Sequence, residues 1–265
     1  MLISPRRRLL EYHQTAMPDR PVLPRVIGHR GAMAYAPENT LAGFREAAER
    51  GAAWIEFDVR LSADGVPVVI HDARLDRTTT GRGLVAKTQY QMIAGLDAGA
   101  WFDRDFAGEC VPRLDDAVGL VSELGLGVNI ELKPTRKHQN ALASAVLGVL
   151  AKRWPQHLPP ALLSSFDCMV LAALREQGSP WPSGFLAKEL PRNWRRQVAA
   201  LGCLSVHCAH DKLTREGAGA VKSAGLVLGA YTVNDPVRAQ TLFGWGVDAV
   251  FSDAPDKVMT GLKGK

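Results

Sequence analysis

Short apolar runs of strand length alternate with segments of helical periodicity from residue 25 to the end of the chain. The runs are rich in Val, Ile, Leu and Phe, which is typical of strands buried on both faces of a parallel sheet. Strands are predicted at 26–30, 54–59, 127–132, 161–165, 184–187, 203–207, 227–233 and 248–252. Helices are predicted near 40–50, 114–124, 138–153, 168–177, 190–201, 214–224, 236–244 and from 256 onwards. The pattern therefore predicts a series of β/α units.

Eight β/α units in about 250 residues are typical of a TIM (β/α)8 barrel, an α/β fold with a closed parallel sheet. No Ser- or Pro-rich linker divides residues 25–265, so we predict a single domain over this range. An open, doubly wound sheet is the alternative arrangement of the same units. That arrangement favours a Gly-rich phosphate-binding loop, which this sequence lacks.

One stretch departs from the regular alternation. Residues 62–65, Ser-Ala-Asp-Gly, predict a turn directly after the second strand, and residues 66–71 follow with no helix between them. This pattern indicates a hairpin that brings His71 across from the second strand. The next residues, 72–113, are rich in Gly, Thr, Arg and Asp. A loop of this length is usually functional or forms a small inserted unit, and we expect it to lie over the barrel mouth.

Carboxylates gather at the predicted carboxyl ends of two strands. Glu56 and Asp58 lie two apart on one strand, and Glu131 lies near the end of the next parallel strand. Residues two apart share a face of a strand, and TIM-barrel active sites lie at the carboxyl ends of the strands. Close carboxylates repel by roughly 1–4 kcal/mol per pair unless some are protonated or share a cation. Oxygen ligands suit a hard ion, so we predict one divalent cation, Mg²⁺ or Ca²⁺, with Mn²⁺ as an alternative.

Basic groups end the same strands. His29 and Arg30 follow the first strand, His71 follows the hairpin, and Lys133 lies two residues after Glu131. Arginine is a good bidentate partner of phosphate, so Arg30, Lys133 and a cation predict a site for a phosphate oxyanion. Two histidines beside that phosphate can serve as general base and general acid near neutral pH. We expect His29 to accept the first proton and His71 to protonate the leaving group, an order that the sequence leaves open.

Two further residues are candidates for substrate binding. His207 and His210 have a spacing found in some transition-metal sites. Because His207 follows a strand of the predicted barrel, we favour a place in the lining of the substrate pocket over a second metal site. Tyr231 also ends a strand, and we predict that it lines the same pocket.

Composition narrows the class of protein. The chain has 265 residues, and 46% of them are hydrophobic, which is ordinary for a globular protein. Residues 1–25 carry five arginines and two acids, a net of +3 out of +5, and we interpret 1–24 as a basic, flexible leader without a secretory signal. The remaining +2 favours a small anionic substrate over nucleic acid. No run predicts a membrane span, and the spacing of the four cysteines indicates reduced thiols in the cytoplasm.

The motifs at these strand ends resemble, in order and spacing, the signature of the glycerophosphodiester phosphodiesterase family. The motifs are His29-Arg30-Gly31, Pro37-Glu38-Asn39-Thr40, Glu56-x-Asp58, His71-Asp72, Glu131-x-Lys133, Leu163-Ser164-Ser165-Phe166, Tyr231-Thr232-Val233-Asn234 and Ser252-Asp253-Ala254-Pro255. The resemblance runs from about residue 26 to residue 258 and is closest to the cytoplasmic bacterial enzymes.

The resemblance implies a TIM barrel with an insertion after the first His-Asp pair. It also implies a metal held by Glu56, Asp58 and Glu131, with His29 and His71 as the catalytic pair. The implied reaction is metal-dependent hydrolysis of small-molecule glycerophosphodiesters. Its products would be sn-glycerol 3-phosphate and an alcohol such as choline, ethanolamine or glycerol, in phospholipid breakdown and glycerol metabolism.

Two alternatives stand beside this interpretation. A phospholipase-D-like enzyme acting on lysolipids would favour a secreted chain with disulfides and an apolar mouth. A non-catalytic ligand-binding barrel would favour loss of a histidine or an acid from the motifs, and all of them are present. Tyr231 stands where many relatives carry tryptophan, which bears on the expected shape of the alcohol or glycerol subsite.

Overall fold

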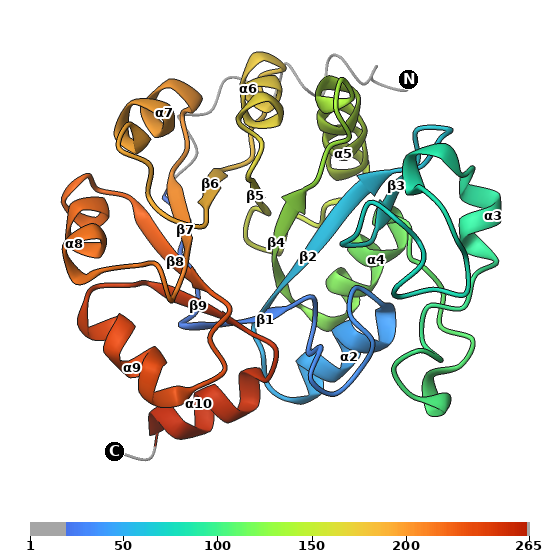
Figure 1. Cartoon of the computed structure of the whole chain (residues 1–265), viewed down its shortest axis with the longest axis horizontal. Coiled ribbons are helices and arrows are strands. Elements are labelled where there is room, and N and C mark those ends of the chain that lie inside the picture. The colour runs from blue at the N-terminus through green and yellow to red at the C-terminus, as the bar shows by residue number, and fades with distance from the viewer. Residues whose placement is uncertain (1–19, 264–265) are drawn as a thin grey trace.

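The fold is a closed barrel of parallel strands in the computed structural model, which describes residues 20–263 (Figure 1). The barrel strands are β1 (Val26–His29), β2 (Trp54–Leu61), β4 (Gly127–Leu132), β5 (Leu162–Ser165), β6 (Ser183–Ala187), β7 (Ser205–Ala209), β8 (Val227–Tyr231) and β9 (Ala249–Ser252). β1 pairs with β2 on one side and with β9 on the other, which closes the sheet. The predicted TIM barrel is confirmed, and the open-sheet alternative is wrong. Most of the predicted leader lies outside the described residues.

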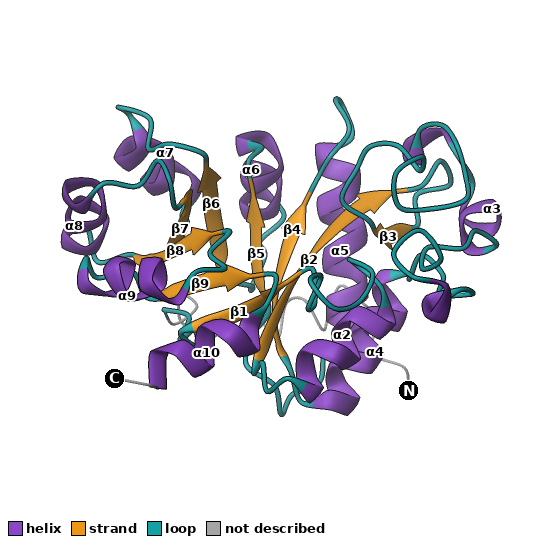
Figure 2. Cartoon of the chain, turned by 60° about the horizontal axis from the view of Figure 1, so that its bottom comes forward, coloured by secondary structure: helices purple, strands orange, loops and turns teal. Residues whose placement is uncertain are grey.

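A helix follows each barrel strand, and together these helices surround the barrel (Figures 1 and 2). They are α2 (Leu41–Glu49), α4 (Leu114–Leu124), α5 (Gln139–Arg153), α6 (Cys168–Glu176), α7 (Trp194–Leu201), α8 (Arg215–Ser223), α9 (Pro236–Gly244) and α10 (Pro255–Lys263). Thr40 caps α2 by accepting a hydrogen bond from the Gly43 amide at 3.1 Å. Asp235 caps α9 with Pro236 in the first turn, as the sequence pattern indicates. None of the helices described is long and apolar enough to cross a membrane.

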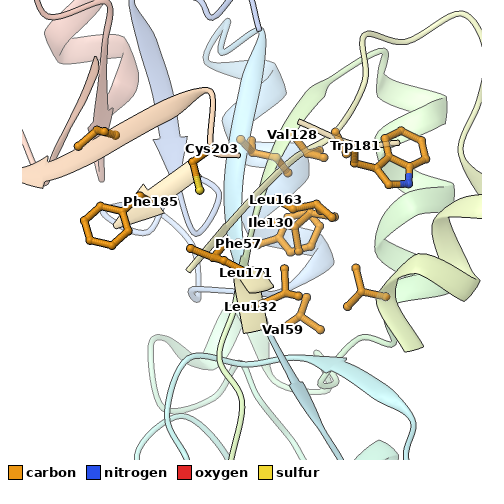
Figure 3. Close-up of a cluster of buried hydrophobic side chains, with 14 of the residues drawn as sticks. Phe57, Val59, Val128, Ile130, Leu132, Leu163, Leu171, Trp181, Phe185 and Cys203 are labelled. Carbon is orange, nitrogen blue, oxygen red and sulfur yellow. The ribbon is translucent and has the colours of Figure 1, made fainter. Parts of the chain in front are cut away.

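The main hydrophobic core lies between the barrel and its helices. Figure 3 shows part of it, where Phe57 of β2, Ile130 of β4 and Phe185 of β6 are buried with Leu171 of α6. On each of these strands the outward residues are apolar. The inward positions of the strands are therefore free to carry polar groups without weakening this core.

The interior of the barrel is closed by a second apolar cluster. Ile27, Trp54, Leu162, Ala249 and Phe251 meet there from four strands, β1, β2, β5 and β9. A Cβ atom on Gly127 would lie 2.1 Å from the indole of Trp54, so only glycine fits beside that ring. The cluster occupies part of the interior, and the polar inward residues of β2 and β4 lie nearer the carboxyl ends of these strands.

The hairpin and the insertion follow β2, as the sequence predicts. β3 (Pro67–Val69) pairs antiparallel with the end of β2, and η1 (Val85–Lys87), α3 (Tyr90–Ala94) and η2 (Arg104–Phe106) follow. These segments pack around their own small core, which comprises Val68, Ile70, Leu75, Val85, Ile93, Ala98 and Val111. The insertion lies mainly beside the barrel and not over its mouth, where we expected it (Figures 1 and 2), because the hairpin carries the chain outward along β2.

Candidate active site

Strand register brings the three predicted carboxylates together. Glu56 and Asp58 point inward from β2, and Glu131 points inward from β4 directly beside Asp58. One oxygen from each residue lies within 4.8 Å of the others. Their side chains are buried, because neighbouring strands surround them on both sides. Among residues 20–263, these three residues form the one group of His, Cys, Asp or Glu side chains placed closely enough to hold a metal ion.

Burial and mutual repulsion dominate the electrostatics of this cluster. Burial, with the charges of Asp58 and Glu131, raises the pKa of Glu56 well above its ordinary value. Burial and the charge of Asp58 raise the pKa of Glu131 to about 7, despite its contact with Lys133. Burial also acts on Asp58, but the charges of Lys133 and Arg30 outweigh it and lower the pKa of that carboxyl to about 2. Two of the three carboxylates therefore need further positive charge to ionise fully.

Two cations lie against the carboxylates. The guanidinium of Arg30 lies 3.4 Å from Asp58 Oδ2, and the backbone N–H of Arg30 donates to Glu56 Oε2 at 3.1 Å. The ammonium of Lys133 lies 2.6 Å from Glu131 Oε1 and 3.4 Å from Asp58 Oδ1. Both cations line the same pocket as the carboxylates. They are placed to meet an anionic ligand that approaches the cluster.

The donor set fits a divalent cation. Asp58 Oδ1 is buried and has no hydrogen-bond partner in the described part of the chain. Oxygens of Glu56 and Glu131 lie within reach of the same point. The Lys133 ammonium, 3.4 Å from Asp58 Oδ1, forms no hydrogen bond with it, and a bound hard cation would supply the missing partner. The site therefore has the ligands that the sequence predicts for a metal.

Asn39 fixes the orientation of Asp58. Its amide donates to Asp58 Oδ2 at 2.8 Å and accepts from the Asp58 backbone N–H at 3.1 Å. Asn39 adopts a left-handed backbone conformation with φ 57°, which asparagine tolerates better than most residues. The first bond holds Oδ2 of the carboxylate and the second holds the backbone of Asp58, while the other carboxylate oxygen, Oδ1, faces Lys133.

Each of the two predicted catalytic histidines is held by a carboxylate. His29 Nδ1 lies 2.6 Å from Asp253 Oδ1, and the Asn234 amide donates to the other oxygen of Asp253 at 2.7 Å. His71 Nδ1 lies 2.6 Å from Asp72 Oδ1. A carboxylate can only accept here, so Nδ1 carries the proton and Nε2 remains available for a ligand. Burial lowers the pKa of His71, although Asp58 opposes this shift.

Ion pairs join Arg77 of the insertion to two carboxylates at the site, Glu38 and Asp72. Arg77 donates to Glu38 at 2.7 and 2.8 Å and to Asp72 at 2.7 and 3.1 Å. Glu38 in turn accepts from Arg30 at 2.8 Å. Arg77 thus contacts the carboxylate that holds His71 and the carboxylate that holds Arg30. The sequence motifs include Glu38 and Asp72 but gave no role to Arg77.

The pocket beside these groups has a volume of about 440 Å³. It is lined by His29, Arg30, Glu56, His71, Asn129, Glu131, Lys133, Phe166, Leu186, Lys188, His207, Tyr231, Thr232 and Phe251. His207 and Tyr231 are among these lining residues, and their contact with a substrate stays a prediction. His210 takes no part in a metal cluster with His207, since its ring nitrogen lies 3.4 Å from the Nε of Arg238 outside the pocket.

The fold and this pocket together define a class of protein. TIM-barrel enzymes act at the carboxyl ends of their strands, and a carboxylate cluster beside Arg, Lys and two histidines suits phosphoryl chemistry assisted by a divalent cation. Comparison with known proteins narrows the class. The sequence profile of the glycerophosphoryl diester phosphodiesterase family matches residues 29–257, and the chain belongs to this family.

Individual relatives resemble the chain over nearly their whole length. A phosphodiesterase of Oleispira antarctica, solved in complex with the product sn-glycerol-3-phosphate, is 38% identical with a TM-score of 0.89, over 91% of this chain and 97% of that one. A glycerophosphodiester phosphodiesterase of Agrobacterium tumefaciens is 32% identical with a TM-score of 0.73, over 90% and 100% of the two chains. A glycerophosphodiester phosphodiesterase of Caldanaerobacter subterraneus is 31% identical over 88% of this chain and 96% of its own.

Proposed function

We propose that this protein hydrolyses glycerophosphodiesters to sn-glycerol 3-phosphate and an alcohol with the help of one divalent cation. The observation that carries the proposal is the meeting of two histidine–carboxylate pairs, three carboxylates and two cations in one pocket. A relative with 38% identity was solved with sn-glycerol-3-phosphate as its product, which supports the same substrate class.

Glu56, Asp58 and Glu131 would hold the cation, since their oxygens lie together and one of them, Asp58 Oδ1, accepts no hydrogen bond in the described part of the chain. We assign Mg²⁺ or Ca²⁺, with Mn²⁺ as an alternative, because all three ligands are hard oxygen donors. When bound, the cation supplies Lewis-acid stabilisation of charge on the phosphate oxygens. Arg30 and Lys133 would bind those oxygens directly, since both face the pocket.

The two histidines would move protons on opposite sides of the phosphate. We assign His71 as base, because burial lowers its pKa and favours the neutral form at pH 7. This exchanges the roles expected from the sequence. His71 Nε2 would take the proton of the glycerol 2-hydroxyl, whose oxygen forms a bond to phosphorus. The bond from phosphorus to the alcohol oxygen then breaks, and His29, which enters this step as the imidazolium with its Nδ1 proton held by Asp253, gives that oxygen its Nε2 proton.

The intermediate of this route is a cyclic phosphate, which water then opens to sn-glycerol 3-phosphate. Attack by the substrate's own hydroxyl has an entropic advantage over attack by free water. In the opening step the roles reverse: His29 takes a proton from water and His71 returns one to the 2-oxygen. The location of the protein in the cytoplasm stays a prediction from its cysteines.

The experiment that tests the function is release of sn-glycerol 3-phosphate from glycerophosphocholine and glycerophosphoethanolamine. We expect turnover with Mg²⁺, Ca²⁺ or Mn²⁺, and none with EDTA until the cation is restored. The Asp58→Asn variant should be inactive, because it removes charge from the cluster. Lysophosphatidylcholine serves as a parallel substrate. Faster turnover of the lysolipid would favour the phospholipase-D-like alternative, and no turnover of any diester would favour a non-catalytic barrel.

A further inference from the structure

The pocket ends on a buried polar group that has an unused hydrogen-bonding atom. Asn129 points inward from β4 on the same face as Glu131 and is 1% exposed. Its Nδ2 donates to Ser164 Oγ at 3.0 Å, whereas its Oδ1 has no partner among residues 20–263. A buried acceptor without a donor costs free energy, so such an atom in a ligand pocket is expected to meet a donor on the ligand.

His207 provides a second polar group at the same end of the pocket. Its Nε2 pairs with Ser205 Oγ at 3.1 Å, and its ring lines the pocket. The ring fits inside the barrel because the neighbouring position on β8 is Gly229, where a Cβ atom would lie 2.9 Å from the imidazole. Burial lowers the pKa of His207 to about 3, so the ring is neutral at pH 7. A neutral imidazole can hydrogen-bond a hydroxyl without attracting a charged group.

Burial distinguishes the two ends of the pocket. Asn129 and His207 are each 1% exposed, and Phe251 beside His207 is 3% exposed. At the opposite end Phe166 is 43% exposed and Lys188 is also exposed. The closed end suits a substrate group of fixed size, and the open end suits an alcohol that differs between substrates.

We infer that Asn129 and His207 form a subsite that binds the terminal (sn-1) hydroxyl of the substrate's glycerol moiety. The inference rests on the proposed function and adds to it the orientation of the substrate. The glycerol end enters the barrel, its terminal hydroxyl donates to Asn129 Oδ1, and the leaving alcohol faces Phe166 and Lys188 at the mouth. The 2-hydroxyl stays near the phosphate, where the proposed reaction needs it.

The test compares sn-glycerol 3-phosphate with the analogue that carries hydrogen in place of its sn-1 hydroxyl. Calorimetry with the wild-type protein should give at least tenfold weaker binding of the analogue, because a site built around a hydroxyl is left unpaired without it. Asn129→Leu, which is nearly isosteric, should bind sn-glycerol 3-phosphate about as weakly as the analogue, whose own affinity should stay close to its wild-type value. Asn140→Leu, the same change at an exposed position of α5, should bind both as the wild type does.

The corresponding choline diesters separate this inference from the proposed function. If the wild type hydrolyses both diesters with kcat/KM values within twofold, the function stands and the subsite is wrong. If the wild type discriminates between the two phosphates in calorimetry but hydrolyses neither diester, the subsite stands and the function is wrong. A loss in Asn129→Leu that is equal for both phosphates would also overturn the subsite. The wild-type comparison decides the matter even where Asn129→Leu fails to fold.

Discussion

Each of the two histidines at this site is paired with a carboxylate. His29 is held by Asp253 and His71 by Asp72, so each imidazole presents the same nitrogen to the pocket. A carboxylate that fixes the tautomer of a histidine also stabilises the protonated form that arises during proton transfer. His29 meets its partner across 224 residues, whereas Asp72 directly follows His71 in the chain.

At this scale we expect His29→Ala and His71→Ala each to lower kcat by about 10²–10⁴, the usual contribution of a general acid or base. Binding of sn-glycerol 3-phosphate should change little, because Arg30 and Lys133 remain. Steady-state kinetics and calorimetry measure the two effects separately. His138→Ala is the matched control, since His138 is exposed at the start of α5. A variant of either pocket histidine with kcat close to that of the wild type would remove that residue from the mechanism.

The strands position the carboxylates of the site, and the regular geometry of a strand explains why the sequence could predict that position. The period of two along a strand puts Glu56 and Asp58 on one face, and the rule that barrel sites lie at strand carboxyl ends brings Glu131 to them. The eight strands and their helices follow from hydrophobic pattern alone, with boundaries that shift by a few residues. β7, for example, begins at Ser205 instead of residue 203.

The residues that sequence reasoning missed depend on contacts that no local pattern encodes. Asp253 meets His29 across 224 residues, and only closure of the barrel brings them together. Arg77 lies in a loop without periodicity, where the direction of a side chain depends on the packing of the whole insertion. Asn129 shares the face of Glu131, which is a usable signal, but a neutral amide gives no electrostatic reason to assign it a role.

Arg77 of the insertion is placed to position groups of the site through its ion pairs with Glu38 and Asp72. We expect Arg77→Gln to lower kcat/KM by roughly tenfold or more, because Glu38 and Asp72 would each lose two charge-assisted hydrogen bonds. Arg77→Lys should fall between the wild type and Arg77→Gln, since lysine keeps the charge without the planar bidentate geometry. Kinetics with melting temperatures measured in parallel would test this order.

Arg74→Gln is the control for that series. Arg74 is also in the insertion, but its ion pair is with Asp76, away from the pocket. Its variant should keep wild-type kinetics. If Arg77→Gln behaves in the same way as Arg74→Gln, the ion pairs of Arg77 serve only the packing of the insertion and have no part in positioning His71 or Arg30.

At the scale of the whole molecule, buried carboxylates repel one another inside the barrel, and a bound cation would relieve this repulsion. Glu131 has a pKa of about 7 in the folded chain against an ordinary value of 4.5. A raised pKa means that the folded state holds its proton more tightly than the unfolded state. The stability that this proton contributes is therefore complete below about pH 4.5 and is lost as the pH rises through 7. His207, whose folded pKa is lowered to about 3, acts in the opposite direction over part of this window.

We therefore expect the pH-dependent loss of stability caused by Glu131 to be visible when the wild type is compared with Glu131→Gln in EDTA. Between pH 5 and pH 8 the wild type should lose of the order of 1–3 kcal/mol of unfolding free energy relative to Glu131→Gln, in which His207 titrates unchanged. Saturating Mg²⁺ or Ca²⁺ should restore the wild type, and more at pH 8 than at pH 5, because a cation binds the ionised carboxylates and only the folded state assembles them. Urea unfolding at the two pH values, with and without cation, measures both effects.

Parallel pH dependence of the two proteins in EDTA would show that Glu131 is already ionised at pH 5 and that the cluster is not strained. A cation effect of equal size at both pH values would separate metal binding from the ionisation of Glu131.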